Sequence, residues 1–199
     1  GQADGVVQRI NLPVSGLPMV SDLLGEQSRA TASLAFSPDG EWLATLSVTD
    51  TLRIWPLSET TLVTSSRPLS ESISGRMTFS ADGRWLATGS KQGTNVYLFD
   101  LDQSNGRPLT LPGHIEGVHA LAFSPDHQLL SVGSGDGVVR GWELNQLEDL
   151  LAVSTSQRKS APPRPVPSKE LLEHNGAVLA LAFQVGEGNR ITLATGSAD

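Results

Sequence analysis

Short apolar runs alternate with compact polar turns along this chain, and the pattern predicts β-strands joined by hairpins. The clearest unit is AFSPDGEWLAT at residues 35–45, in which the apolar runs SLAF and WLATLS flank the turn SPDG. In such a turn Pro38 presets φ to about −65°, Asp39 accepts from nearby backbone N–H groups, and Gly40 takes a left-handed conformation at little cost. The flanking runs mix β-forming with small residues, which suits strands covered on both faces.

The same pattern returns along the chain at a nearly constant interval. Its first marker is a phenylalanine that closes an apolar run, and it gives intervals of 43, 44 and 60 residues between Phe36, Phe79, Phe123 and Phe183. The second marker is an aromatic residue further on, with intervals of 44 and 43 residues between Trp55, Phe99 and Trp142. A period of about 40 to 45 residues with several strands per unit is typical of propeller blades, and the 3.6-residue pattern of helical repeats is missing.

Two segments show a family resemblance. The residues Gly113-His114, GVHALAFSPD and SVGSGDGVVRGWEL, which end near Trp142, resemble a WD40 repeat, and residues 174–199 resemble most of another. Near the start of the chain, ADGVVQRINL aligns with GDGVVRGWEL at residues 135–144. The resemblance implies an all-β fold, a WD40-like β-propeller segment of four-stranded antiparallel blades that is built for recognition rather than chemistry.

Strand counting predicts how the blades divide the chain. We expect one repeat array over residues 1–199, with sixteen strands in all. Its units are a half blade at 1–28, blades at about 29–70, 71–113 and 114–173, and a half blade at 174–199. The chain therefore begins and ends in the middle of a blade, and we interpret it as an open arc of a larger propeller. A closed four-blade ring, in which the two half blades pair, is the alternative.

The WD40 resemblance also implies a structural hydrogen-bond set of histidine, hydroxyl, aspartate and tryptophan in each blade. The residues that match it are His114, Asp136 and Trp142 in the third repeat, and His174, Thr195 and Asp199 in the fourth. Val132 stands at the hydroxyl position of the third repeat. The first repeat has Thr45 and Trp55, with Gln27 and Thr49 at the other places, and the second has Thr88 with Ser70, Gln92 and Phe99. Packing should therefore dominate in the first two blades.

Composition narrows the class of protein. The formal charge of −7 at pH 7 argues against a general nucleic-acid surface, which needs clustered Lys and Arg. The chain has no cysteine, so it forms no disulfide framework, and a reducing compartment is allowed. Its apolar runs are too short to span a membrane. We expect a cytoplasmic protein with no cofactor and no membrane or nucleic-acid partner.

A Pro-rich insert explains the long 60-residue interval. The segment STSQRKSAPPRPVPSKE has the composition of a linker, and we expect residues 153–168 to loop out between the third and fourth strands of their blade. Lys159, Pro162 and Pro165 fit the basic-x-x-Pro-x-x-Pro pattern that some aromatic grooves bind, so a proline-motif reader is a candidate partner. A plain loop extension is the alternative.

Catalysis would require His, Asp or Glu side chains that converge in the central channel. Of the four histidines, His114 and His174 fit structural positions, and His127 stands where Gly40 and Gly83 stand in other turns. His119 is left on the innermost strand, where we interpret it as a packed side chain rather than a ligand or base. We expect no enzyme activity, and a propeller hydrolase or metal site in the channel is the alternative.

The sequence thus predicts a non-catalytic protein-protein interaction scaffold or sensor segment. In the family it resembles, partners sit on the face formed by loops entering the innermost strand and loops between the second and third strands. The candidate partner-binding residues on those loops are Lys91, Gln92, Ile115, Glu116, His119 and Asn175. The near-consensus repeats also resemble those of large bacterial multidomain proteins, in which propellers accompany signalling kinases or NTPases.

Overall fold

Sixteen β-strands and two short helical turns make up the described part of the chain, which we analyse as a computed structural model. The structure describes residues 6–11, 20–26, 30–47, 51–57, 65–68, 76–89, 93–102, 108–149 and 169–199. The strands form five antiparallel sheets, of which three have four strands and two have two strands. The all-β fold and the strand count expected from the repeats are therefore confirmed.

The three four-stranded sheets are the complete blades. The first blade consists of β3 (Thr31–Phe36), β4 (Trp42–Ser47), β5 (Thr51–Pro56) and β6 (Ser65–Pro68). The second consists of β7 (Arg76–Phe79), β8 (Trp85–Gly89), β9 (Val96–Asp100) and β10 (Leu109–Leu111). The third consists of β11 (Val118–Phe123), β12 (Leu129–Ser134), β13 (Val138–Glu143) and β14 (Lys169–Glu173).

Two-stranded sheets flank these blades. The outer pair is β1 (Val6–Asn11) with β2 (Val20–Glu26), and it corresponds in sequence to the third and fourth strands of a blade. The inner pair is β15 (Val178–Val185) with β16 (Ile191–Ser197), joined through the turn η1 (Glu187–Asn189), and it corresponds to the first and second strands. Each pair is thus the half that the other lacks.

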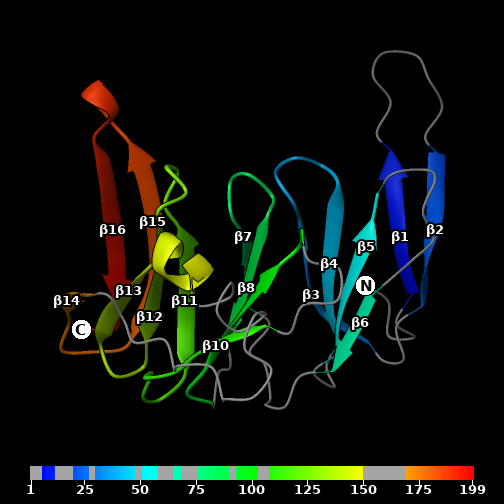
Figure 1. The fold of residues 1–199 in the computed structure, drawn as a ribbon. Coiled ribbons are helices and arrows are strands. Elements are labelled where there is room, and N and C mark those ends of the chain that lie inside the picture. Colours follow the sequence, from blue (N-terminus) through cyan, green and yellow to red (C-terminus); the bar gives the residue numbers. More distant parts are fainter. Residues whose placement is uncertain are drawn as a thin grey trace.

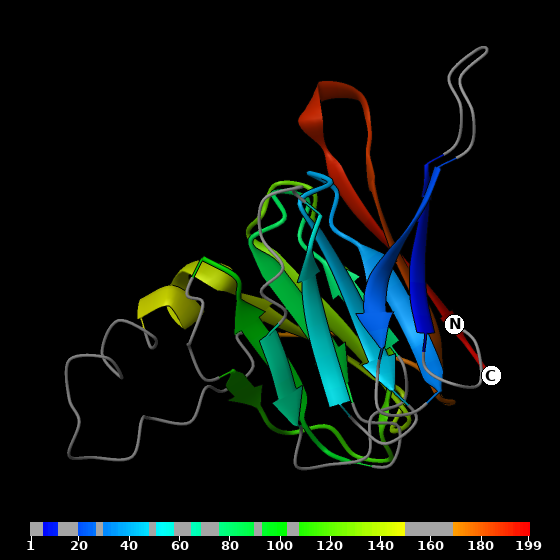
Figure 2. The same ribbon diagram turned by 90° about the vertical axis from the view of Figure 1, so that its right-hand side faces the viewer.

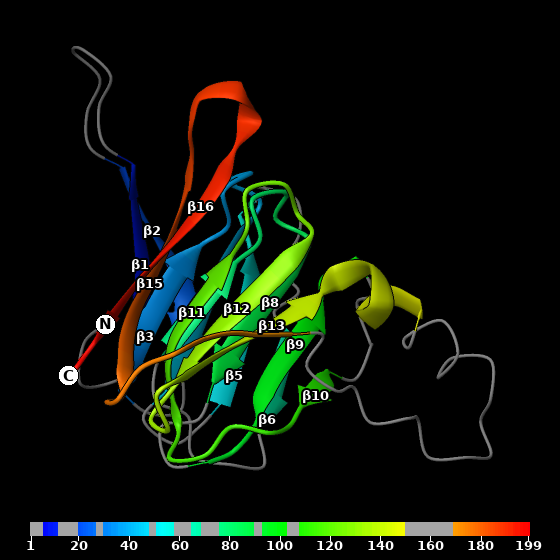
Figure 3. The ribbon, with the colours of Figure 1, turned by 90° about the vertical axis from the view of Figure 1, so that its left-hand side faces the viewer.

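The five sheets stand in an open row (Figure 1), with the outer pair at one end and the inner pair at the other. The first strands β3, β7, β11 and β15 are neighbours along this row, as expected for the innermost strands of successive blades. The described strands of the two pairs belong to separate sheets, so this structure is not the closed four-blade ring. Seen from its two ends (Figures 2 and 3), the row shows the β15–β16 hairpin reaching beyond the hairpins of the three complete blades.

The hairpin turns form as the SPDG pattern predicts. Gly40 and Gly83 have φ of 74° and 75°, and His127 takes the same left-handed conformation with φ of 58°. In each turn a serine hydroxyl donates to the aspartate two residues on, as in the pairs Ser37–Asp39, Ser80–Asp82 and Ser124–Asp126. These bonds satisfy the polar groups that reverse the chain between the first and second strands.

The hydrophobic core is divided into clusters that lie between successive sheets, and no single central core exists among the described residues. One cluster joins the first and second blades and includes Leu46, Ile54, Phe79 and Phe99. A second joins the second and third blades and includes Trp85, Leu98, Val132 and Trp142. Because the second and third blades have a neighbouring sheet on each face, their central strands read as continuous apolar runs.

The chain after β13 contains an element that the repeat pattern does not indicate. Residues 144–149 form a helical turn, and Leu144 and Leu147 are buried in the cluster between the second and third blades. Figure 3 shows this turn beside β9 and β10. The expected insert at 153–168 lies outside the described residues. In the described part of the chain, we find no helix long and apolar enough to cross a membrane.

Candidate functional site

The loops expected to form the binding face do meet in the third blade. The loop before β11 receives hydrogen bonds from the loop between β12 and β13, because the Asp136 N–H donates to the Ile115 carbonyl at 3.2 Å and the Gly135 N–H donates to the Gly117 carbonyl at 3.1 Å. The Ser134 hydroxyl adds bonds to the carbonyls of Ile115 and Gly117, at 2.6 and 3.0 Å. The backbone of the loop before β11 is therefore held in place by the end of β12 and the loop that follows it.

The inner pair repeats this arrangement. The Asn175 N–H donates to Asp199 Oδ2 at 3.0 Å, and the Ser197 hydroxyl donates to the Gly176 carbonyl at 2.8 Å. The His174 N–H donates to the Gly137 carbonyl at 2.9 Å, which ties this loop to the third blade. The loops before β11 and β15 thus form one continuous surface.

Ile115 is the most exposed large hydrophobic residue on this surface. Its side chain is 60% exposed although it sits in a rigidly hydrogen-bonded loop. The next residue, Glu116, is exposed and has a φ of 64°, a conformation that favours glycine. Asn175 is exposed too, whereas His119 is partly buried on β11. The other two candidate residues, Lys91 and Gln92, lie outside the described residues.

In the fourth repeat, His174 is hydrogen-bonded to Thr195 and lies near Asp199. His174 Nε2 lies 2.9 Å from Thr195 Oγ1, and His174 Nδ1 lies 3.6 Å from Asp199 Oδ2. The Asp199 pKa lies below its usual value because the Asn175 N–H and the Ser197 hydroxyl bond to the carboxylate. In the first blade Trp55 Nε1 donates to Thr45 Oγ1 at 2.8 Å, so the tryptophan–threonine link is present there.

The third repeat differs from the expectation that Asp136 pairs with His114. Arg140, four residues after Asp136 along the chain, takes the carboxylate instead, with Nη1 at 2.8 Å from Oδ2 and 3.1 Å from Oδ1. His114 packs against Trp142, their ring centroids being 5.0 Å apart. A permanently charged guanidinium competes better for a buried carboxylate than a neutral imidazole does.

His114 and Trp142 are consequently left with unused polar atoms. Among the described residues, neither ring nitrogen of His114 has a hydrogen-bond partner, and Trp142 Nε1 has no acceptor. Burial, together with the nearby Arg140 charge and against the opposing effect of Asp136, lowers the pKa of His114 to about 4. These atoms lack partners because Val132 stands where the first and fourth repeats have a threonine hydroxyl.

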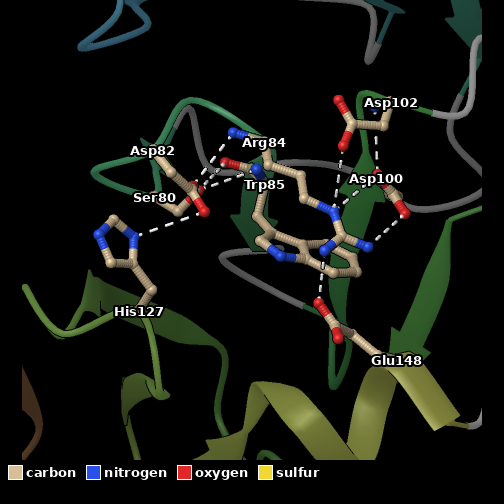
Figure 4. A network of polar contacts seen from close by, with 8 residues as sticks. All are labelled: Ser80, Asp82, Arg84, Trp85, Asp100, Asp102, His127 and Glu148. Atoms are coloured by element: carbon tan, nitrogen blue, oxygen red, sulfur yellow. Dashed lines mark hydrogen bonds and ion pairs between the residues drawn. The ribbon is translucent and has the colours of Figure 1, made fainter.

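Arg84 is the centre of a second polar network, which joins the second blade to the helical turn of the third (Figure 4). Its guanidinium contacts Asp100 at 3.2 Å, Asp102 at 3.4 Å and Glu148 at 2.5 Å, and lies over the Trp85 ring. The Asp100 hydrogen bond and the surrounding carboxylates raise the pKa of Arg84 above its ordinary value.

The neighbouring turn makes a further contact between blades (Figure 4), where His127 Nδ1 lies 3.5 Å from Asp82 Oδ2. Partial burial opposes the ionised form of Asp82, but bonds from Ser80 and the Arg84 N–H, together with His127, hold its pKa below the usual value. Neither network is visible in the sequence pattern, since Glu148 and His127 reach them from the third repeat and no residue spacing marks these contacts.

Metal and acid–base chemistry find little support in these groups. Within the described ranges, no cluster of three or more His, Cys, Asp or Glu side chains is placed to hold a metal ion. His119, the only histidine that sequence analysis left without a structural role, is partly buried on β11. The geometry of the described site is that of a presented surface with a rigid backbone.

Similar proteins carry the same repeats. The chain is 25% identical over 174 residues to the anaphase-promoting complex subunit cdc20 of Dictyostelium discoideum, which covers 87% of this chain and 31% of that protein. It is 52% identical over 44 residues to protein Notchless of Drosophila melanogaster, which covers 20% of this chain and 9% of that protein. Both relatives are eukaryotic, so they give no support to the bacterial affiliation.

Solved structures agree with the fold. A chain in the crystal structure of the mitotic checkpoint complex matches with a TM-score of 0.64 and 25% identity, over 89% of this chain and 50% of that one. The structure of U3-55K matches with a TM-score of 0.60 and 19% identity, over 87% of this chain and 45% of that one. This chain therefore spans half or less of the length of these relatives.

A family model identifies the repeats directly. The model described as WD domain, G-beta repeat matches residues 22–56, 71–100 and 107–143, which together exceed half of the chain. The matched segments include β2 to β5 and most of the second and third blades. With the sheet topology and the similar structures in agreement, the chain belongs to the WD40 family of β-propeller repeat proteins.

Proposed function

We propose that this chain is a protein-interaction scaffold that binds a partner on the loop face before β11 and β15. The observation that carries the proposal is Ile115, which is 60% exposed on a loop whose backbone is fixed by four hydrogen bonds from the loop between β12 and β13 and its flank. An exposed aliphatic side chain on a rigid loop loses little conformational entropy on binding, and such side chains serve as anchors of interfaces.

The relatives support a protein partner. Their names place one of them in the anaphase-promoting complex and one similar structure in the mitotic checkpoint complex. We extend only the class of partner, a protein, to this chain. Glu116 follows the anchor along the chain and favours a partner segment with a basic residue beside an apolar one, since opposite charges steer association. Asn175 lies exposed on the adjoining loop before β15.

The test is a comparison of two exposed hydrophobic residues on different faces. A binding protein isolated from the source cells and then purified is titrated against the chain and its variants by calorimetry. Ile115→Ala should raise the Kd about tenfold, because a buried anchor contributes on the order of 1–2 kcal/mol. Leu172→Ala on β14, 46% exposed in the native protein, is the control and should leave the Kd unchanged. Equal effects of the two changes would refute this binding face.

Three finer points belong to the same proposal. The scaffold acts without catalysis, which a hydrolase and lactonase screen would contradict if it found activity that His119→Ala removes. The scaffold works in the cytoplasm, since a chain without cysteine forms no disulfides and needs no oxidising compartment. Fluorescence microscopy of the tagged full-length protein tests this location.

Lys159, Pro162 and Pro165 form a second docking motif, which a proline-motif reader binds. Pro162→Ala should abolish that binding.

A further inference from the structure

The loop before β15 places a glycine directly after an exposed asparagine, as the pair Asn175-Gly176. In such a pair the backbone nitrogen of the glycine can attack the side-chain amide of the asparagine, because glycine is flexible and has no side chain that shields this nitrogen. The pair is therefore a candidate modification site on the proposed partner-binding face.

The hydrogen bonds of this loop hold atoms other than the two that would react. The Asn175 N–H donates to Asp199 Oδ2 at 3.0 Å, and the Gly176 carbonyl accepts from the Ser197 hydroxyl at 2.8 Å. Among the described residues, nothing bonds to the Asn175 side-chain amide or to the Gly176 N–H. An attack of this nitrogen on the amide thus starts from two free groups in a positioned backbone.

Exposure is a property of this place in a blade. Ile115 holds the same place in the third blade, directly after the histidine, and its side chain is 60% exposed. The third blade has a neighbouring sheet on each face, so a sheet beside the blade does not cover this loop position. The exposure of Asn175 therefore belongs to the loop itself.

The fold also requires the glycine. A Cβ atom at position 176 would lie 2.9 Å from the Asp199 backbone nitrogen and 3.1 Å from the Ala198 carbonyl carbon, which is too close for a side chain in this backbone. Position 175 has no such restriction, since an isoleucine fills the equivalent place at Ile115. The asparagine is consequently the member of the pair that the fold leaves open to change.

We propose that Asn175 deamidates in the folded protein without an enzyme and that the product places a carboxylate on the partner-binding face. The Gly176 nitrogen bonds to the side-chain carbonyl carbon of Asn175, and the amide nitrogen leaves as ammonia, taking the proton of the Gly176 N–H. Water then opens the cyclic imide at one of its two carbonyl groups. The product at position 175 is an aspartate or an isoaspartate.

The new charge changes the face on which the proposed function depends. Glu116 lies on the adjoining loop before β11, so deamidation gives the continuous surface of these two loops a second carboxylate. A partner segment with a basic residue is attracted more strongly by two carboxylates than by one. This effect on binding rests on the proposed function, whereas the deamidation itself depends only on the loop.

The first experiment measures deamidation by mass spectrometry after incubation of the folded chain at neutral pH. Trypsin releases residues 170–190 as one peptide, which contains Asn175 and also Asn189, an exposed asparagine followed by Arg190. Fragmentation of this peptide compares the two sites in the same molecule. Conversion of the amide to the acid should be about tenfold faster at Asn175, because the side chain of Arg190 hinders the attack at Asn189.

Asn175→Gln is the matched control and should remove the fast conversion. The other Asn-Gly pair, Asn105-Gly106, lies outside the described residues and in a different tryptic peptide, so it does not contribute to this measurement. Equal rates at Asn175 and Asn189 would overturn the proposal, as would a fast rate at Asn175 that is seen only after unfolding in urea.

The second experiment measures the effect of the charge with Asn175→Asp, which leaves the backbone unchanged. Calorimetry with the purified partner should give a Kd about threefold lower than for the unmodified chain at low salt, and the difference should vanish at high salt. The control is Asn145→Asp on the helical turn beside β9 and β10 (Figure 3), which should not change the Kd. An unchanged Kd for Asn175→Asp would overturn the effect on binding. Failure of the Ile115 test would instead refute the binding face and leave the deamidation rates as they are.

Discussion

At the scale of single residues, Val132 decides the chemistry of the third blade. At the same position Thr45 accepts from Trp55 Nε1 at 2.8 Å, and Thr195 lies 2.9 Å from His174 Nε2. Valine offers no such group, and the polar atoms of His114 and Trp142 stay without partners among the described residues. Each such atom costs part of its desolvation free energy, about 1–3 kcal/mol.

Val132→Thr should therefore stabilise the protein, in contrast to most polar substitutions of a fully buried valine. The new hydroxyl would accept from Trp142 Nε1 or bond to His114, and we expect a gain of about 1 kcal/mol in the free energy of unfolding. The control is Val139→Thr, which buries a hydroxyl on the next strand and should cost about 1–2 kcal/mol. Urea titration measures both, and a loss in both variants would contradict the hydroxyl interpretation.

His114 should make stability depend on pH. Its pKa in the folded protein is about 4, below the ordinary value of 6.5, so the unfolded chain takes up a proton first as the pH falls. Stability is full above pH 6.5 and declines between 6.5 and 4, by an amount on the order of 3 kcal/mol at the lower end. His114→Leu should remove this part of the pH dependence of the unfolding free energy.

The measurement is the difference in unfolding free energy between wild type and His114→Leu at a series of pH values, since the other titrating groups cancel in that difference. Asp136 and Arg140, which face the imidazole, are present in both proteins. A difference that stays constant from pH 7.5 to about 4.5 would show that His114 does not titrate in this way.

At the scale of elements, the helical turn at 144–149 joins two blades in two ways. Leu144 and Leu147 are buried in the apolar cluster between the second and third blades, and Glu148 contacts Arg84 at 2.5 Å. The guanidinium side chain is 34% exposed and the Glu148 side chain 40% exposed, so water screens this ion pair. Packing of the two leucines should therefore contribute more than the ion pair to the stability of this contact between blades.

Leu147→Ala should cost about 2–4 kcal/mol, since it leaves a cavity at a buried position. Glu148→Gln should cost less than about 1 kcal/mol, because Asp100 and Asp102 still hold the guanidinium and the pair is partly exposed. Denaturant titration of both variants checks the order. A larger loss for Glu148→Gln would mean that the ion pair fixes the turn and the leucines only follow.

At the scale of the whole molecule, stability depends on the apolar clusters between successive sheets, because each blade is covered by its neighbours rather than by a common core. Leu98→Ala, at a residue buried between the second and third blades, should therefore cost about 2–4 kcal/mol in the free energy of unfolding, since it leaves a cavity at that interface. Leu172→Ala on β14, at a residue 46% exposed, is the control and should cost less than about 0.5 kcal/mol. Urea titration measures both variants, and equal losses would contradict this account of the interface.

The comparison of Phe36 with Phe79 shows where sequence analysis reaches its limit. The two residues close the same motif, yet one is 54% exposed and the other 8% exposed, because only the second has two inner strands packed on it. The neighbouring sheet decides this exposure. In the same way, the choice of Asp136 between Arg140 and His114, and the contact of Arg84 with Glu148, depend on which side chains meet in the folded protein.

Features that repeat locally could be predicted from the order of the amino acids alone. The period of the aromatic markers, the apolar runs and the SPDG turns predicted the number of strands, their pairing into hairpins and the left-handed turn at Gly40, because each depends on interactions within a few residues. Which copy of a motif is covered, and which partner a buried charge takes, became visible in the folded arrangement. Both depend on groups that are brought together by packing, where distance and burial decide which contact forms.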